Sequence, residues 1–208
     1  MDPAERILLD APGLLRDHLC MPSAPPYRIR VATLADVPAL RSLIEQSVRV
    51  LQKHDYSAAQ IEGALGHSLG LDTQLIEDRT YFVAEPLDSS GAAVQSGILA
   101  ACGGWSYRRT LFGSDSGPGR EAAFLNPAVD AAKIRAIFVH PDYARRGLGS
   151  LILHHCEQQA RLAHFNRFEM GSTLTGVPLY KLRGYVPCET INVPLPNGEV
   201  LPVVRMTK

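Results

Sequence analysis

The sequence lacks a net charge and lacks any long apolar run. Its 208 residues carry 21 Lys and Arg against 21 Asp and Glu, so the formal net charge at pH 7 is zero. A neutral chain has no general electrostatic attraction to nucleic acid or to an anionic membrane surface. Because no apolar run approaches the length of a transmembrane helix, we expect neither nucleic acid nor a membrane among the partners.

Metal-binding and disulfide signatures are also missing. The chain has no C-x-x-C and no H-E-x-x-H pattern, so no metal site is predicted, and it has no G-K-[ST] of a P-loop nucleotidase. The N-terminus carries Asp2 and Glu5 among its apolar residues, which is unlike a secretory signal peptide. Reduced thiols in a cytoplasmic protein are expected for the widely spaced cysteines, Cys20, Cys102, Cys156 and Cys188.

Composition along the chain divides it into two parts. Residues 1–26 contain a leucine-rich stretch interrupted at Pro12-Gly13 and then several prolines, which is typical of an extension with a short broken helix and a linker. Residues 27–208 are long enough to bury a sizeable core and carry no internal repeat, so we predict one folded domain there.

Hydrophobic periodicity predicts the elements of this domain. Alternating or short apolar runs predict strands at 27–31, 80–85, 97–104, 134–139, 167–173, 191–195 and 200–206. Helical spacing predicts helices at 37–51, 57–65, 151–163 and 177–183, with Gly184 as the terminating residue of the last. The third helix is expected to bury Leu148, Leu151, Ile152, His155, Cys156 and Ala163 and to expose Glu157, Gln158 and Arg161. The order predicts an α+β fold with mostly antiparallel strands.

One segment carries chemistry. Residues 140–150, H-P-D-Y-A-R-R-G-L-G-S, join a predicted strand to a predicted helix through two arginines and two glycines. Such a turn directs several backbone N–H groups at one point, and the helix dipole and the guanidinium groups add positive charge there. The segment therefore predicts a pyrophosphate-binding loop.

The element order and the motifs together resemble the GNAT N-acetyltransferase family over residues 27–208. The acyl-CoA loop of that family reads Q/R-x-x-G-x-G/A, and residues 144–149 read A-R-R-G-L-G, with Ala144 departing at the first position. Residues 137–143 are similar to the approach to that loop, and residues 179–185, L-Y-K-L-R-G-Y, to the later L-Y-x-x-x-G-F/Y segment. The resemblance implies a mostly antiparallel mixed sheet of about seven strands, splayed between strands 4 and 5 and flanked by helices.

The resemblance also implies roles for particular residues. Acetyl-CoA would be the cosubstrate, its pantetheine arm would pair with the fourth strand, and Tyr180 would protonate the departing thiolate. Thr173 stands where many members carry an Asn that hydrogen-bonds the cosubstrate. Cosubstrate-binding roles are thus expected for Ile137, Phe138, Val139, Arg145, Arg146, Gly147, Leu148, Gly149, Ser150 and Thr173.

The general base is left open by the sequence. Arg135 occupies the position where many members carry a glutamate on the fourth strand, and an arginine cannot accept the ammonium proton. Glu85, Glu169 and His140 are the candidates, although a salt bridge or a structural hydrogen bond explains each of them as well. Solvent is the remaining alternative.

We therefore expect an N-acetyltransferase in which a primary amine of a small molecule or a peptide attacks acetyl-CoA directly, without a metal. Loop 108–132 and the helix at 57–65 are expected to select the acceptor, together with Trp105, Tyr107, Arg108 and Arg109. Two alternatives are a non-catalytic acyl-CoA sensor and a site for another cofactor, such as a mononucleotide. The sequence does not define the oligomeric state; a homodimer is one possible assembly and is the commonest one among soluble proteins.

Overall fold

The computed structural model describes residues 26–94, 97–117 and 120–208. The predicted N-terminal extension, residues 1–26, falls outside these ranges except for its last residue, and so does its expected short helix. Within the described ranges, no helix combines the length and the apolar character needed to cross a membrane.

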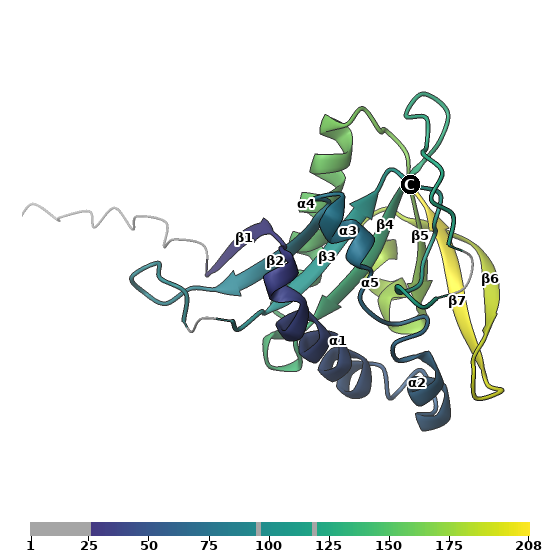
Figure 1. Cartoon of the computed structure of the whole chain (residues 1–208), viewed down its shortest axis with the longest axis horizontal. Coiled ribbons are helices and arrows are strands. Elements are labelled where there is room, and N and C mark those ends of the chain that lie inside the picture. Colours follow the sequence, from purple (N-terminus) through teal and green to yellow (C-terminus); the bar gives the residue numbers. More distant parts are fainter. Residues whose placement is uncertain (1–25, 95–96, 118–119) are drawn as a thin grey trace, which may run out of the picture.

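The described part of the domain is built on one mixed sheet of seven strands in the order β1-β2-β3-β4-β5-β7-β6 (Figure 1). Neighbouring strands are antiparallel except β4 and β5, which are parallel. The predicted α+β fold with a mixed sheet is confirmed. The strands are β1 (Tyr27–Val31), β2 (Tyr81–Pro86), β3 (Ala101–Ser106), β4 (Ala132–Val139), β5 (Phe168–Thr173), β6 (Val186–Pro194) and β7 (Val200–Thr207).

Helices cover both faces of the sheet. On one face lie α1 (Val37–Leu51), α2 (Ala58–Ala64) and α3 (Thr73–Glu77), and on the other lie α4 (Leu148–Leu162) and α5 (Val177–Leu182). Side chains of a strand alternate between the faces. Accordingly, Tyr81 and Val83 of β2 pack with the core of the first face, while Phe82 and Ala84 pack with α4 on the second.

Local sequence signals explain where several helices begin and end. Ser57 accepts the N–H of Gln60 at 3.1 Å and Gln60 accepts the N–H of Ser57 at 3.0 Å, which is the predicted capping box before α2. Gly184 follows α5 with a φ of +87°, as its position after the helix predicted.

Three elements differ most from the sequence prediction, and α4 and β4 each begin two or three residues earlier than predicted. Helix α3 was not predicted, because a helix of five residues capped by Asp72 is too short to show a period. Strand β3 begins at Ala101 rather than at 97. Strand β6 begins at Val186 rather than at 191, and as an exposed edge strand it has no buried face to impose an alternating pattern on the sequence.

The predicted faces of α4 are wrong at two positions. Leu151, expected in the core, is 41% exposed, and Glu157, expected in solvent, is only 3% exposed. Both carboxylate oxygens of Glu157 accept hydrogen bonds from Lys208 Nζ at 2.8 Å, and Arg161 Nη2 donates to Glu157 Oε2 at 3.2 Å. The Lys208 ammonium therefore supplies the positive charge that allows this carboxylate to be buried, and helical periodicity carries no information about such a distant partner.

The strands β4 and β5 separate after a short contact. They pair only at Ala132 with Phe168 and at Lys133 with Glu169, although β4 continues to Val139 and β5 to Thr173. The predicted splay between these strands is confirmed. A register shift against β3 between Cys102 and Gly104 marks a bulge in β4 at this point, where Ala136 has a φ of +52°.

A matched pair of truncations tests which face of α4 supports the core. Leu153 is 1% exposed and Leu162 is 74% exposed on the same helix. We expect Leu153→Ala to lower the free energy of unfolding by about 2–5 kcal/mol, because the substitution leaves a cavity. Leu162→Ala should change it by no more than about 0.5 kcal/mol in urea denaturation. Equal losses in the two variants would contradict this packing.

Candidate functional site

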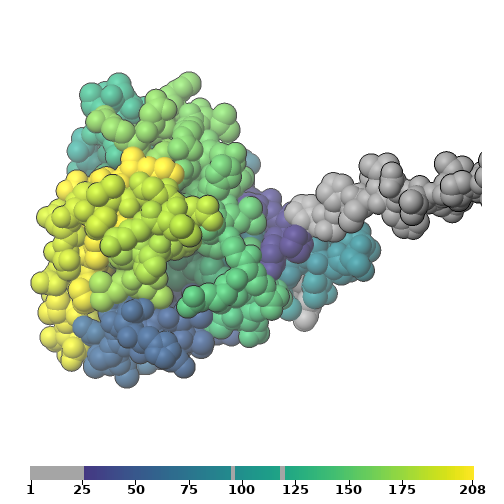
Figure 2. All heavy atoms as spheres, turned by 180° about the vertical axis from the view of Figure 1, so that it is seen from behind, coloured from purple at the N-terminus to yellow at the C-terminus, as the bar shows by residue number. Residues whose placement is uncertain are grey.

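A cavity of about 480 Å³ lies where the separated strands reach the loop before α4. We call it the loop cavity; its walls come from the end of α1, the end of β4, residues 144–150 and α5. The face shown in Figure 2 is hollowed where the green surface near residue 145 meets the yellow-green surface near 180 and the blue surface of α1 and α2. The predicted residues on its wall are Ile137, Phe138, Val139, Arg145, Gly147, Leu148, Gly149, Ser150, Thr173 and Tyr180.

The loop has the backbone conformation that a close ligand approach requires. Gly147 has a φ of +81° and forms the N-cap of the 15-residue helix α4, and Arg145 also has a positive φ of +63°. A Cβ on Gly147 would meet no atom within 4 Å, so the loop is open to solvent there. Since the first N–H groups of a helix have no partner within it, the start of α4 presents free donors and a partial positive charge.

The side-chain charges at this loop are arranged differently from the expectation. Arg146 does not line the loop cavity, and its guanidinium instead lies 5.6 Å from the centroid of the Tyr143 ring. Arg183, which was not predicted as a site residue, donates from Nε to Ser150 Oγ at 3.0 Å. Its position within the L-Y-K-L-R-G-Y segment was visible in the sequence, but no local pattern shows that this segment returns to the loop.

The end of β4 offers unpaired backbone groups to the cavity. The backbone N–H of His140 donates to the Ala100 carbonyl at 2.9 Å, so this N–H points toward the β3 side of the strand. Because successive residues of a strand face opposite sides, the N–H of Val139 points toward β5, which has already diverged. Backbone donors and acceptors of this kind suit an extended, amide-rich ligand.

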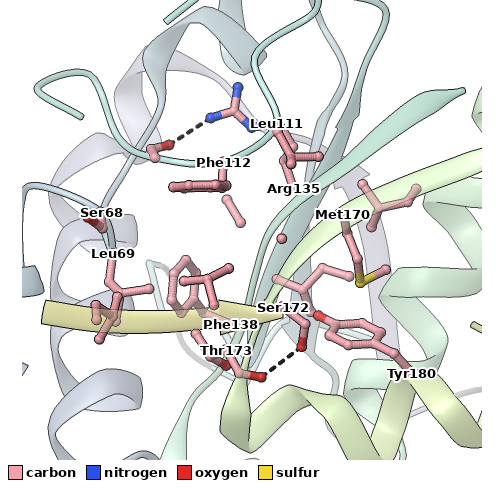
Figure 3. Close-up of a pocket in the computed structure, with 18 of the residues that line it drawn as sticks. Ser68, Leu69, Leu111, Phe112, Arg135, Phe138, Met170, Ser172, Thr173 and Tyr180 are labelled. Atoms are coloured by element: carbon pink, nitrogen blue, oxygen red, sulfur yellow. Dashed lines mark hydrogen bonds between the residues drawn. The ribbon is translucent and has the colours of Figure 1, made fainter. Parts of the chain in front are cut away.

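Tyr180 lies at the junction of two cavities. Its side chain is buried, at 8% exposure for the residue, and Figure 3 shows its hydroxyl directed toward the cavity interior beside Ser172. Burial raises the pKa of Tyr180 well above its usual value, and the coulombic effect of Cys156 adds to this. The hydroxyl is therefore protonated across the physiological range and can act as a hydrogen-bond donor.

A second, smaller cavity of about 70 Å³ occupies the gap between β4 and β5. We call it the splay cavity (Figure 3). Its walls are mostly apolar and come from both faces of the sheet, including Leu69, Phe112, Met170, Leu201 and Val203. It shares Gln52, Ile137, Phe138, Thr173 and Tyr180 with the loop cavity, so the two cavities adjoin across these residues.

Arg135 provides the charge on the wall of the splay cavity. Its Nη1 lies 2.7 Å from Asp72 Oδ2, and its Nη2 donates to the Gly113 carbonyl at 2.7 Å. Asp72 is fully buried, and its Oδ1 also accepts a hydrogen bond from Arg120 Nη2 at 3.1 Å. The guanidinium of Arg135 is thus a fixed, compensated charge and not a proton acceptor.

Comparison with known protein families identifies part of the chain. Residues 124–196, which include the loop and Tyr180, match the model described as an acetyltransferase (GNAT) domain. Residues 124–196 thus belong to a GNAT acetyltransferase domain. No curated protein matches the sequence.

Solved structures share the fold of this GNAT domain at low sequence identity. A GCN5-related N-acetyltransferase from Rhodopseudomonas palustris is 19% identical, with a TM-score of 0.61 over 90% of this chain and 98% of its own. The PaiA N-acetyltransferase from Thermoplasma acidophilum, in complex with coenzyme A, is 12% identical, with a TM-score of 0.56 over 88% and 98%. The YncA protein from Salmonella typhimurium, with its cofactor acetyl-CoA, is 16% identical, with a TM-score of 0.54 over 88% and 92%.

None of the predicted candidates for a general base, Glu85, Glu169 and His140, lines either of the two described cavities. Although burial opposes the effect, hydrogen bonds from Arg28 and Arg30 lower the pKa of the Glu85 carboxyl. Glu169 is bound in the same way by Lys133 and Arg205, which also lower its pKa against the effect of burial. His140 Nδ1 accepts a hydrogen bond from the Asp142 N–H at 3.2 Å, and the side chain thereby caps the short helical turn that follows β4.

Only some of the residues that were expected to select the acceptor line one of the two cavities. Leu111, Phe112 and Gly113 of the long loop line the splay cavity, whereas helix α2 lines neither cavity. Trp105 is buried in the core on the α4 side, and Arg108 forms an ion pair with Asp78. Trp105, Tyr107, Arg108 and Arg109 are absent from the walls of both described cavities.

The buried ion pair beside the splay cavity can be tested by removing one partner. We expect Asp72→Ala to destabilise the domain by about 3–5 kcal/mol, because Arg135 would remain charged and buried without its partner. In an Arg135→Met background the same substitution should cost clearly less, as measured by a double-mutant cycle in urea. Glu62→Ala, which breaks an exposed pair with Arg49, should have little effect. Full additivity of the Asp72 and Arg135 substitutions would contradict the pairing.

Proposed function

We propose that this GNAT domain is an N-acetyltransferase that transfers an acetyl group from acetyl-CoA to a primary amine by direct attack. The observation that carries the proposal is the position of Tyr180, a buried hydroxyl at the junction of a larger cavity beside a glycine loop and a smaller apolar one. Two adjoining cavities with a proton donor between them are what a two-substrate transfer requires.

The loop cavity is suited to the nucleotide end of acetyl-CoA. Its anion-binding groups would be the N–H groups of residues 146–150 and the guanidinium of Arg145, with Arg183 held nearby on Ser150 Oγ. Gly147 leaves the approach free of side-chain atoms. We assign the side-chain charge to Arg145 rather than to Arg146, because Arg146 stacks on Tyr143 away from the cavity.

The separated end of β4 is suited to the pantetheine arm. Ile137 and Val139 would offer their backbone amides to it, and Phe138 and Thr173 form the adjoining wall. The N–H of Val139 would also polarise the thioester carbonyl, because a fixed donor stabilises the charge that develops on the oxygen during attack.

Tyr180 would complete the reaction as a general acid. Acetyl-CoA supplies the acetyl thioester, and the neutral amine forms the new C–N bond as the C–S bond breaks. Burial raises the pKa of Tyr180, so its hydroxyl is protonated when the thiolate departs and would donate its proton to the sulfur. The amine loses one proton to solvent, and the tyrosinate regains one from solvent.

One observation favours a second candidate, a non-catalytic acyl-CoA sensor. Among the described residues, neither cavity is lined by an aspartate, a glutamate or a histidine. A sensor would bind acetyl-CoA but would not release CoA in the presence of any amine.

Calorimetric titration with acetyl-CoA, run in parallel with a CoA-release assay on a panel of amines, separates these functions. Binding together with amine-dependent release supports the transferase. Binding without release supports the sensor, and failure to bind would remove the assignment of the loop cavity.

Substitution of the tyrosine hydroxyl tests the general acid. We expect Tyr180→Phe to lower the rate of acetyl transfer by about 10²- to 10⁴-fold while the affinity for acetyl-CoA stays the same. Tyr185 is a matched control, since it is buried 6.0 Å away between ring centroids and does not line either cavity. Equal rates for Tyr180→Phe and the wild-type protein would exclude Tyr180 as the acid.

The two neighbouring arginines give a paired test of the loop. We expect Arg145→Ala to weaken acetyl-CoA binding by about 10- to 100-fold, because it removes a charged donor from the cavity. Arg146→Ala should weaken binding by less than about threefold, since an exposed charge outside the cavity contributes little. Calorimetry on both variants checks this, and the reverse order of effects would contradict the assignment.

A further inference from the structure

Gln52 is a buried polar side chain that the proposed reaction does not yet use. It follows the last residue of α1, is 5% exposed and lines both the loop cavity and the splay cavity. Its side-chain oxygen Oε1 is buried and has no hydrogen-bond partner within the described structure. A buried carbonyl without a partner is costly, and its position at the junction of two cavities points to a ligand that supplies the donor.

The splay cavity has a definite chemical character. Its volume of about 70 Å³ leaves room for only a small group, since one water molecule needs about 10–15 Å³ by this measure. Its walls are mostly apolar, and Arg135 is the one charged residue on the described wall. An ammonium ion would therefore find no carboxylate here to balance its charge, and binding it would carry the full cost of desolvation.

The surrounding titratable groups do not change this character. Asp72 and Arg120 lie behind Arg135 in one ion-pair cluster, Glu169 is bound by Lys133 and Arg205, and Tyr180 stays protonated. Asp55, three residues after Gln52, is exposed and accepts Thr175 Oγ1 at 2.6 Å. None of these carboxylates reaches the wall of the described splay cavity.

We propose that the splay cavity takes a small, largely apolar primary amine in its neutral form, with Gln52 Oε1 accepting one of its N–H groups. This inference rests on the proposed acetyl transfer and names the acceptor class for it. A hydrogen bond to Oε1 holds the amine next to Tyr180 with its lone pair free for attack. The favoured acceptors are weakly basic amines, because a larger fraction of them is neutral near pH 7.

The wild-type protein tests the protonation state directly. The probes are ethylamine and 2,2,2-trifluoroethylamine, which are similar in size but differ greatly in basicity, with CoA release measured from pH 7 to pH 9 at saturating acetyl-CoA. For ethylamine we expect kcat/KM to rise about tenfold per pH unit, in proportion to the neutral fraction. For the fluorinated amine, already neutral in this range, we expect kcat/KM to stay flat. A common inflection for both amines would reveal a base in the enzyme and overturn the proposal.

Two substitutions at Gln52 test its role. We expect Gln52→Leu to lower kcat/KM for both amines by about tenfold while the affinity for acetyl-CoA and the thermal midpoint of unfolding are retained. Gln52→Glu, which places a carboxylate at the junction, should flatten the steep pH dependence of ethylamine. Gln46→Leu, on the exposed side of the same helix, is the matched control and should change neither parameter.

The outcomes distinguish this inference from the proposed function. Failure of acetyl-CoA to bind would remove both. Two other results would leave the transferase in place and overturn the acceptor assignment. One is acetyl-CoA binding with turnover of larger or cationic amines only, and the other is an unaltered kcat/KM in Gln52→Leu.

Discussion

The separation of β4 from β5 is the constraint on which the rest of the site depends. The two strands pair at Ala132 and Lys133 and then diverge, so the edge of β4 up to Val139 lacks a partner strand. That divergence creates the splay cavity within the sheet and leaves backbone amides facing the loop cavity at its end. A continuous sheet would satisfy those amides and fill the gap with side chains, and neither cavity would exist.

The charged groups are arranged around this gap according to how far they are buried. At the open end, the start of α4 and Arg145 place positive charge where an anionic ligand can reach it from solvent. Inside the gap, the guanidinium of Arg135 is compensated by Asp72 and fixed on the Gly113 carbonyl. The described lining residues of the interior include no carboxylate or imidazole that could take up a proton, so an amine substrate must enter in its neutral form.

Much of this arrangement could be predicted from the sequence, because its signals are local. The glycines and arginines of residues 144–149 lie at a strand–helix junction, and the L-Y-x-x-x-G-Y segment follows at a recognisable distance. The capping box at Ser57 and the terminating Gly184 likewise depend on neighbours within a few residues. The fold class and the position of the splay followed from the resemblance that these motifs carry.

What could not be predicted depends on partners that are distant in sequence. Glu157 is buried because Lys208 Nζ donates a hydrogen bond to it. Arg183 contacts Ser150, 33 residues earlier in the chain, and the guanidinium of Arg146 lies over the Tyr143 ring. Gln52 is an ordinary polar residue at a helix end until the fold places it between two cavities. Such contacts leave no period or motif in the chain, and only the tertiary structure reveals them.

The central claim, that the diverged edge of β4 and the loop before α4 form one cosubstrate site, is tested most directly by a crystal structure of the protein with CoA. The account predicts the pyrophosphate against the N–H groups of residues 146–150 beside Arg145, and the pantetheine arm along Val139 with its sulfur near Tyr180. A CoA molecule bound elsewhere, with the loop cavity empty, would contradict it.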